Sequence, residues 1–433
     1  MNQLMGKFKI FCSILSFLFI SVAFQNCGNI AVNKSSDSAS GNSPAGNNGE
    51  SQENLNAPVS CRREAALASS LADITIPADK YLYNNYFTRT HVLGDDLFIL
   101  ADYSYGNQII TGQPATGATG VVEAKYFSSS GAVSSISLPT IAGYTWNSQA
   151  GSAPSWCFIG DSISNFKTDV YVLFYCTGNS TAAKFTNHIY KFSKNSKTFE
   201  PFYVSTTFVH GINLNKANEL MFIETVPSVP GVAYTYQIKK MVNPGAPTNI
   251  GTQFTSAQIQ EHFLLRPGIY ETENGELNVL TFKNNIYGRL KVAGGSFSVL
   301  NWSQQASFVL QAFDTKKIFY SNNTAGGAPA TKIFEVDPIN FSESLKYSDG
   351  LYTYNFTALV KNVFTKAGFD RSVMQYKTWI SYDNGVNFSA VSNLSTQVNQ
   401  TVITADNKFY SIAVDQFSGG KIKASIYSLN CAD

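Results

Sequence analysis

The sequence predicts an all-β protein that is exported from the cell. Charged residues make up 14% of the chain and aromatic residues another 14%. This balance is typical of strands rich in Tyr, Phe, Val and Thr that are joined by turns of Asn, Gly and Asp. Many short apolar segments alternate with polar turns, and helical periodicity is confined to short stretches. The strongest helical candidate is residues 63–71, so we expect one short helix at most.

The first 27 residues predict export. Lys7 and Lys9 precede an almost wholly apolar segment, residues 10–24. This segment is too short and too early for a lasting transmembrane helix, but it suits the apolar region of a secretory signal. An ordinary signal peptidase could cut after the small-x-small site of residues 21–23, which would leave Cys27 unmodified.

The apolar segment ends in Phe-Gln-Asn-Cys-Gly, residues 24–28, which resembles a bacterial lipoprotein lipobox. Gln25 departs from the small or aliphatic residue that is usual there. The resemblance implies that Cys27 is the lipidated N-terminus of the mature protein, anchored in a membrane. Because Asn29 rather than Asp follows Gly28, the same resemblance implies the outer membrane, with the domain either periplasmic or surface-exposed.

Three regions follow from this interpretation. Residues 1–26 are the signal peptide, and residues 27–60 are the lipidated cysteine with a tether rich in Ser, Asn and Gly. The tether lacks aromatic residues and cannot bury enough apolar area to offset its ordering entropy. Residues 61–433 are predicted to form one folded domain.

An internal repeat runs through this domain. A short apolar strand, a polar turn and a second apolar strand recur, and each such hairpin is followed by another strand pair. The second strands are expected to begin near Leu97, Val170, Leu220, Leu277, Ile318, Val373 and Phe409. The spacing of roughly 50 residues resembles that of four-stranded β-propeller blades, without a WD or kelch motif. We therefore expect a single β-propeller of about seven blades, with six or eight as alternatives; tandem β-sandwiches would need repeats nearer about 100 residues.

The last repeat offers three strand signals, at 401–405, 409–414 and 422–427. A strand from the other end of the chain, at 74–76 or 81–83, could complete it and close the ring.

The cysteines fit this closure. Beyond the signal there are five, an odd number for an exported protein, so a lipidated Cys27 leaves four to pair. We expect the disulfides Cys61–Cys431, which would lock the ring, and Cys157–Cys176, which would join adjacent strands. The alternative is that one or both pairs remain buried thiols.

Residues 381–388 match the Asp-box pattern S-x-D-x-G-x-x-F at Ser381, Asp383, Gly385 and Phe388. The match resembles the turn that recurs in bacterial neuraminidases and other Asp-box propellers. Asp383 would accept backbone N–H bonds, Gly385 would take a left-handed conformation, and Phe388 would pack beneath the turn. The resemblance favours a propeller and implies a structural role for these residues.

A sialidase uses three arginines to hold a carboxylate, a Tyr–Glu nucleophile pair and an Asp acid/base. Arg89, Arg266 and Arg371 begin different repeats and could converge on the axis, with Asp95, Asp102 or Glu271 as carboxylates. The sialidase R-I-P motif is missing, because Leu265-Arg266-Pro267 lacks the isoleucine and lies mid-chain. The structural alternative is that these arginines make ordinary contacts at the surface or between blades.

Other chemistry has little support in the sequence. The four histidines lack metal-ligand spacing, and we expect no metal site and no cofactor. A net charge of +2 gives no electrostatic case for binding nucleic acid.

We therefore expect a non-enzymatic binding or scaffold module for an envelope protein or glycan, held at the membrane by its lipid. In architecture it is similar to the propeller lipoprotein of the outer-membrane barrel-assembly machinery. If the protein is an enzyme, the expectation is a sialidase-like glycoside hydrolase.

Overall fold

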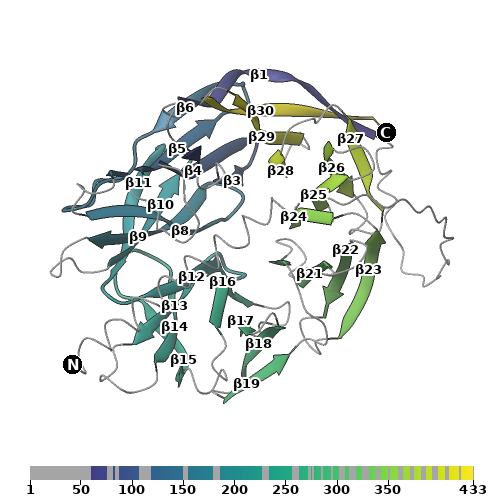
Figure 1. Ribbon diagram of the computed structural model, residues 1–433. Helices are drawn as coiled ribbons and strands as arrows, with labels where there is room; N and C mark the ends of the chain where they lie inside the picture. The colour runs from purple at the N-terminus through teal and green to yellow at the C-terminus, as the bar shows by residue number, and fades with distance from the viewer. Residues whose placement is uncertain are drawn as a thin grey trace.

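The computed structural model consists of β-sheets, mostly antiparallel, grouped around a central axis (Figure 1). Every regular element among the described residues is a β-strand. The structure describes residues 60–75, 81–82, 87–106, 119–149, 155–178, 186–226, 234–255, 263–271, 275, 277–283, 286–293, 296–301, 308–311, 318–323, 331–337, 342–349, 352–358, 364–370, 375–381, 387–392, 398–404, 409–418 and 421–432. Over this part of the chain, no helix is long and apolar enough to cross a membrane.

Four of the sheets are four-stranded meanders, in which each strand pairs with the next along the chain. The first is β8 (Ser155–Ser164), β9 (Asp169–Gly178), β10 (Thr186–Ser193) and β11 (Thr198–Ser205). The second is β12 (Val209–Leu214), β13 (Leu220–Val226), β14 (Thr235–Met241) and β15 (Thr248–Thr255). The third is β16 (Phe263–Glu271), β17 (Leu277–Lys283), β18 (Ile286–Ala293) and β19 (Ser296–Asn301). The fourth is β20 (Phe308–Gln311), β21 (Ile318–Asn323), β22 (Thr331–Val336) and β23 (Glu343–Asp349).

A six-stranded sheet precedes these four along the chain. Its strands are β2 (Tyr81–Leu82), β3 (Phe87–Leu93), β4 (Asp96–Gly106), β5 (Thr119–Phe127), β6 (Val133–Ile136) and β7 (Asn147–Gln149). Strands β3 to β6 pair in sequence order, as in the meanders, while β2 pairs with β4 and β7 with β5. We refer to it as the β3–β6 sheet.

The remaining sheet has eight strands in the order β24-β25-β26-β27-β1-β30-β29-β28. They are β24 (Tyr352–Ala358), β25 (Phe364–Asp370), β26 (Gln375–Ser381), β27 (Ser389–Ser392), β1 (Ser60–Thr75), β30 (Lys421–Ala432), β29 (Phe409–Ser418) and β28 (Val398–Ile403). Strand β1 runs antiparallel to β30 and parallel to β27. The first and last strands of the chain therefore lie side by side.

The first strand of each meander lies nearest the axis, and these strands contact one another around it (Figure 1). Contacts join β28 to β3, β3 to β8, β8 to β12 and β12 to β16, and they also join β20 to β24 and β24 to β28. The last strands, such as β11, β15 and β23, lie at the periphery. This arrangement is that of a β-propeller-like fold, which agrees with the fold class predicted from the repeat.

Residues 63–71, the best short helical candidate of the sequence, belong to strand β1 instead. A helix of so few residues is marginal in water even with good helix formers. Pairing with β30 along most of the strand offers many more hydrogen bonds. Within this pairing Ile74 lies opposite Ile422, as the first of our two alternatives proposed, and Cys61 lies opposite Cys431.

The expected starts of the second strands agree with the structure in six of seven repeats, where β4, β9, β13, β17, β21 and β29 begin within one residue of the predicted positions. The seventh is wrong. Val373 lies between β25 and β26, and the second strand of that repeat, β25, begins at Phe364. Apolar residues occur in all three strands from 352 to 381, so the pattern gave no unique choice.

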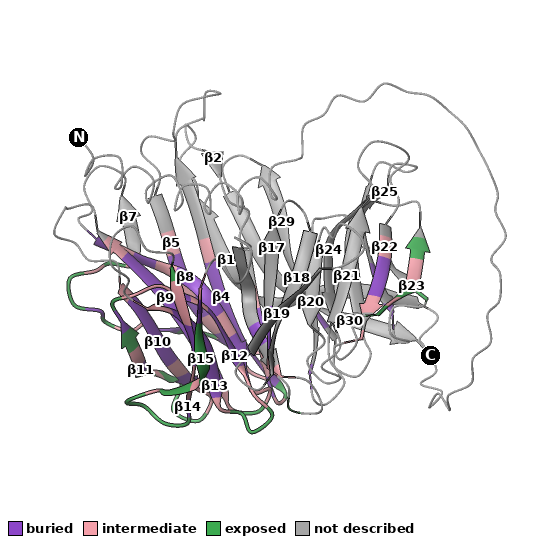
Figure 2. Ribbon diagram, turned by 90° about the horizontal axis from the view of Figure 1, so that it is seen from below, coloured by how far each residue is buried: buried purple, intermediate pink, exposed green. Residues whose placement is uncertain are grey.

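Apolar side chains fill the spaces between neighbouring sheets. Between the β3–β6 and β8–β11 sheets, the rings of Phe98 and Phe192 stack 4.1 Å apart, and both residues are fully buried. A second cluster, which includes Leu173 and Phe222, joins the β8–β11 and β12–β15 sheets. Figure 2 shows buried residues along the inner and middle strands, while exposed residues gather on the turns and on β11 and β15.

Candidate functional site

The innermost strands carry β-bulges. The pairing register shifts in β8, β12, β16, β24 and β28, each time against the second strand of the same sheet. In β8 the extra residue is Gly160. A Cβ atom there would lie 2.6 Å from the ring of Tyr175, so glycine is required. Bulges are over-represented beside functional sites because they redirect side chains and free backbone groups.

Charged side chains of the adjoining sheet hold the β8 bulge. Arg89 on β3 donates from Nη1 to Oδ1 of Asp161 at 3.2 Å and from Nη2 to the carbonyl of Gly160 at 3.1 Å. The other carboxylate oxygen of Asp161 accepts the backbone N–H of Ile212 on β12 at 3.1 Å. Asp161 thus ties together the innermost strands of three consecutive sheets.

Two titratable residues complete this axial cluster, which comprises Arg89, His91, Asp102 and Asp161. His91 lies 2.8 Å from the hydroxyl of Ser162 through Nε2. Burial, reinforced by the positive charge of Arg89, lowers the pKa of His91 to about 3, so the imidazole is neutral at physiological pH. Burial raises the pKa of Asp102 to about 6, although Arg89 and the backbone N–H of Ile159 act in the opposite direction.

The raised pKa of Asp102 predicts a pH-dependent stability. The unfolded chain has an aspartate pKa of about 3.9, so the folded state binds more protons between about pH 4 and pH 6. We expect the free energy of unfolding of the wild type, relative to Asp102→Asn, to fall as the pH rises through this interval. Urea unfolding of both proteins at several pH values measures the difference. Asp95→Asn, at an exposed turn residue, is the control; a wild-type advantage that grows with pH would contradict the assignment.

The structure describes the three arginines of the sialidase hypothesis to different extents. Arg89 forms an ion pair with Asp161 of the adjoining sheet, which agrees with the structural alternative. Arg266 lies in β16, of which only the backbone is described at that point, and Arg371 lies outside the described residues. Of the three carboxylates, Asp102 is the one near Arg89. Asp95 lies in the turn between β3 and β4. Glu271 lies at the end of β16, where it accepts the backbone N–H of Lys216 at 2.8 Å.

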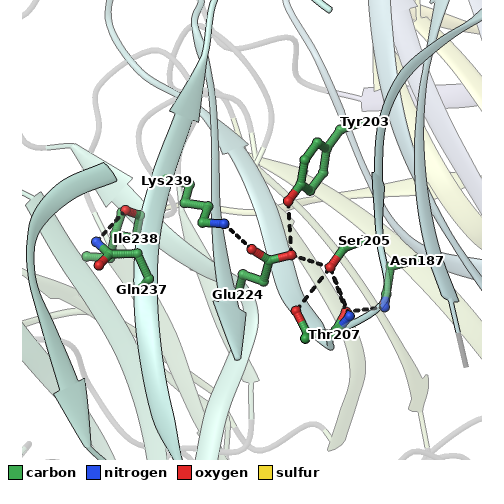
Figure 3. A network of polar contacts seen from close by, with 8 residues as sticks. All are labelled: Asn187, Tyr203, Ser205, Thr207, Glu224, Gln237, Ile238 and Lys239. Carbon is green, nitrogen blue, oxygen red and sulfur yellow. Dashed lines mark hydrogen bonds and ion pairs between the residues drawn. The ribbon is translucent and has the colours of Figure 1, made fainter. Parts of the chain in front are cut away.

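A second polar network lies between β11, β13 and β14 (Figure 3). The carboxylate of Glu224 forms an ion pair with Lys239 and accepts hydrogen bonds from the hydroxyls of Ser205 and Tyr203, the latter at 3.1 Å. Burial raises the pKa of Glu224, but the Lys239 and Ser205 hydrogen bonds outweigh it, and the net pKa is lowered.

The same network bears on catalysis, because a Tyr–Glu pair is the sialidase nucleophile. Burial, and then the charge of Glu224, raise the pKa of Tyr203. Its phenol is therefore protonated at neutral pH and is a poor nucleophile. Tyr203 lies on the peripheral strand β11, and the pair joins two sheets rather than opening onto the axis. We assign it a structural role.

Aromatic rings follow one end of the β8–β11 and β12–β15 sheets. Trp156 contacts Phe158, whose ring meets the buried Tyr175; Phe208 stacks on Tyr175 with 5.1 Å between centroids. The series continues from Phe208 to His210 and from His210 to Tyr236, at 4.6 and 5.1 Å. We call Trp156, Phe158, Phe208, His210 and Tyr236 the aromatic track. All five are partly exposed, whereas Tyr175 beneath them is buried.

Tyr175 and the β8 bulge hold the aromatic track in place. The Tyr175 hydroxyl donates to the carbonyl of Val209 at 2.7 Å, and its ring covers Gly160. His210 lies 2.8 Å from the hydroxyl of Thr225 through Nε2. The sequence suggested aromatic residues at strand positions, but it did not reveal this track, because its members come from three separate segments and meet only after the sheets pack.

The other predicted site residues are found in part. A disulfide joins Cys157 and Cys176 across β8 and β9, as expected, and both residues are buried. Cys61 and Cys431 are paired across β1 and β30, and their disulfide stays a prediction. Cys27 lies outside the described residues.

The Asp-box match falls between β26 and β27, where we expected a hairpin. Ser381 is buried, and the ring of Phe388 contacts Tyr347 of β23 with 4.7 Å between centroids. Asp383 and Gly385 lie outside the described residues, so the turn itself stays a prediction. Within the described part of the chain, no group of three or more His, Cys, Asp or Glu side chains could hold a metal ion.

Comparison with known proteins gives no family. No family model matches the chain, and no curated protein matches it. Among solved structures, it is similar to an oligogalacturonate lyase from Vibrio parahaemolyticus, with 11% identity, a TM-score of 0.46, and coverage of 86% of this chain and 97% of that chain. It is also similar to the Pyrococcus horikoshii acylaminoacyl peptidase, with 8% identity, a TM-score of 0.48, and coverage of 80% of this chain and 51% of the peptidase.

A third similar structure is the β-propeller domain of the Trilobed protease from Pyrococcus furiosus, which has an open velcro topology. Its identity is 11% and its TM-score 0.42, over 62% of this chain and 82% of that chain. Similarity at this level carries no argument about function. The strand order and contacts described above are therefore the basis for the fold assignment.

Proposed function

We propose that this protein is an outer-membrane lipoprotein whose propeller is a non-enzymatic binding or scaffold module for an envelope protein or glycan. The aromatic track is the observation that carries the proposal. Partly exposed rings at one end of two neighbouring sheets, joined through the buried ring of Tyr175, suit recognition, since aromatic side chains contribute large contact areas at low entropic cost.

The proposal includes a closed ring of seven blades. Dividing the eight-stranded sheet between β27 and β1 leaves two four-stranded groups, and with the β3–β6 sheet and the four meanders this makes seven. The pairing of β1 with β30 supports closure by the two ends of the chain. A closed ring presents loops from several blades around one axis, which makes a broad face for a ligand.

The charged residues of the described sheets support a non-enzymatic module. Arg89 and Asp161 hold a bulge, and Glu224 and Lys239 join two sheets, so these groups are used in packing. The alternative, a sialidase-like hydrolase, needs Arg89, Arg266 and Arg371 to hold a substrate carboxylate together.

One experiment separates the two functions. Purified protein is assayed for turnover of a fluorogenic sialoside, and in parallel it is used to capture ligands from envelope extracts and on a glycan array. We expect specific capture without turnover. Turnover by the wild type that is lost in Arg266→Ala would overturn the proposal in favour of the hydrolase.

The anchor makes a separate prediction. We expect mass spectrometry of the protein purified from membranes to find a mature chain that begins at Cys27 and carries lipid. The reasons are the apolar signal segment, the lipobox-like residues and the odd number of cysteines that remain after cleavage. Cys27→Ser is expected to release the protein from the membrane fraction. A mature chain that begins at Phe24 with an unmodified Cys27 would refute the anchor.

A further inference from the structure

The two ends of the β8–β11 and β12–β15 sheets differ in chemistry. One end, which we call the neutral face, comprises the described residues 155–158, 175–177, 186–188, 205–210, 224–226, 234–237 and 252–255. These residues lie together because β8 and β12 begin, and β9 and β13 end, on this side. The aromatic track runs across it.

Among these residues, the neutral face has one carboxylate and neither an ammonium nor a guanidinium group. The carboxylate is Glu224, which is buried and paired with Lys239. The polar groups that remain are hydroxyls, such as those of Thr225 and Thr186, side-chain amides, and the imidazoles of His188 and His210. Burial lowers the pKa of His188, which keeps that imidazole neutral as well.

The opposite end of the same two sheets is charged. Its turns and strand ends carry Lys167, Asp169, Lys194, Lys197, Lys216, Glu219 and Lys240. Ion pairs form there between Lys194 and Asp96 at 2.7 Å and between Lys240 and Glu219 at 3.1 Å. Since both ends belong to the same strands, the scarcity of charged groups among the described residues of the neutral face is not explained by overall composition.

We infer that the neutral face binds an uncharged oligosaccharide along the aromatic track. This inference rests on the proposed function and names its ligand class. A sugar ring has an apolar face of C–H groups and a rim of hydroxyls, so it requires both an aromatic surface and neutral hydrogen-bonding partners. An acidic glycan would need a cation to offset its charge, and a typical protein partner would meet a polar, partly charged rim.

The positions of the rings define the path of the ligand. Trp156 and Phe158 form its β8 end, and Phe208 and His210 continue it across the start of β12. Tyr236 forms the other end, beside the exposed Tyr234. Successive partly exposed rings can each contact a sugar unit, which favours a chain of several units over a single one.

The test uses the full-length protein in detergent and a panel of neutral hexasaccharides: cellohexaose, maltohexaose, mannohexaose and the N-acetylglucosamine hexamer. Hexagalacturonate and sialyllactose are the acidic probes. Binding is followed by calorimetry and by intrinsic tryptophan fluorescence, to which Trp156 contributes as one of four tryptophans. We expect at least one neutral oligomer to bind, and the acidic probes not to bind.

Two variants locate the site. Tyr234→Ala removes an exposed ring beside the track, and Trp156→Ala removes a ring of the track itself; thermal unfolding of both variants checks that they are folded. We expect each to weaken binding of the neutral oligomer by about ten-fold or more, as for a central contact residue. Val242→Ala, at an exposed residue on the charged end, is the matched control and is expected to bind as the wild type does.

Failure of this inference and failure of the proposed function give different results. If neutral oligomers do not bind, or if they bind Tyr234→Ala and Trp156→Ala as tightly as they bind the wild type, the inference is overturned. If in addition an envelope protein or an acidic glycan is captured, the binding-module proposal still stands. If sialoside turnover is found instead, the proposed function itself fails.

Discussion

Replacement of Asp161 by alanine is expected to lower the free energy of unfolding by about 3–5 kcal/mol, because it removes one partner of a largely buried ion pair. The carboxylate side chain is 9% exposed and that of Arg89 is 24% exposed. Without Asp161, the Arg89 guanidinium loses its ion-pair partner and the backbone N–H of Ile212 loses its acceptor. Urea unfolding measures the change.

Two further variants distinguish the ion pair from general damage. Asp95→Ala, at an exposed turn, is expected to change stability by less than about 0.5 kcal/mol. Arg89→Met combined with Asp161→Ala should cost less than the sum of the single changes, because the second removal no longer leaves an unpaired charge. Additive losses would show that Arg89 and Asp161 act independently.

Cys431→Ser is expected to destabilise the protein by an amount approaching about 5 kcal/mol, since a disulfide to Cys61 would close a very long loop in the unfolded chain. The two cysteines are direct partners across β1 and β30, at the junction of the chain ends. Thermal unfolding measures the loss, and non-reducing peptide mapping should find Cys61–Cys431 next to Cys157–Cys176.

The double variant Cys61→Ser/Cys431→Ser provides the control. If the two form one bond, the double variant should melt where either single variant melts. Cys27→Ser should leave the melting temperature unchanged, because that residue lies in the predicted tether. Additive effects of the two single changes, or a crossed pair such as Cys61–Cys157 in the peptide map, would refute the bond.

The sequence predicted the fold well wherever local patterns determine it. Second strands such as those at Leu97 and Val170 were located because their apolar runs are flanked by strong turn residues. The strand at residues 60–75 was misjudged, because its alanines and leucine favour a helix locally and only the distant strand β30 supplies its partners.

Sites that arise from packing were harder to predict. Arg89 and Asp102 were candidates from the sequence, but Asp161 was not, because its role depends on a bulge and on two neighbouring sheets. Likewise, Trp156 and Tyr236 are far apart in the chain and belong to one surface only after β8 and β14 are placed. Residue type alone did not distinguish Tyr236 from the many buried tyrosines.

The bulges of the innermost strands also change which neighbour each side chain meets. In β8, Phe158 and Ile163 face the same core although an odd number of positions separates them, and in β12 the same holds for Val209 and Ile212. An uninterrupted strand would send the members of each pair to opposite sides. The inward–outward alternation therefore reverses its phase at the bulge, which hides these strands from a simple period-two search.

This reversal divides each innermost strand into two segments with separate tasks. In β8, the segment before Gly160 supplies Trp156 and Phe158 to the aromatic track at the edge of the core, and the segment after it supplies Asp161 to the contact between sheets. Substitutions in the first segment leave the alternation of the second unchanged. A substitution at Trp156 is therefore expected to change the proposed binding surface while the contacts of Asp161 between the sheets are retained.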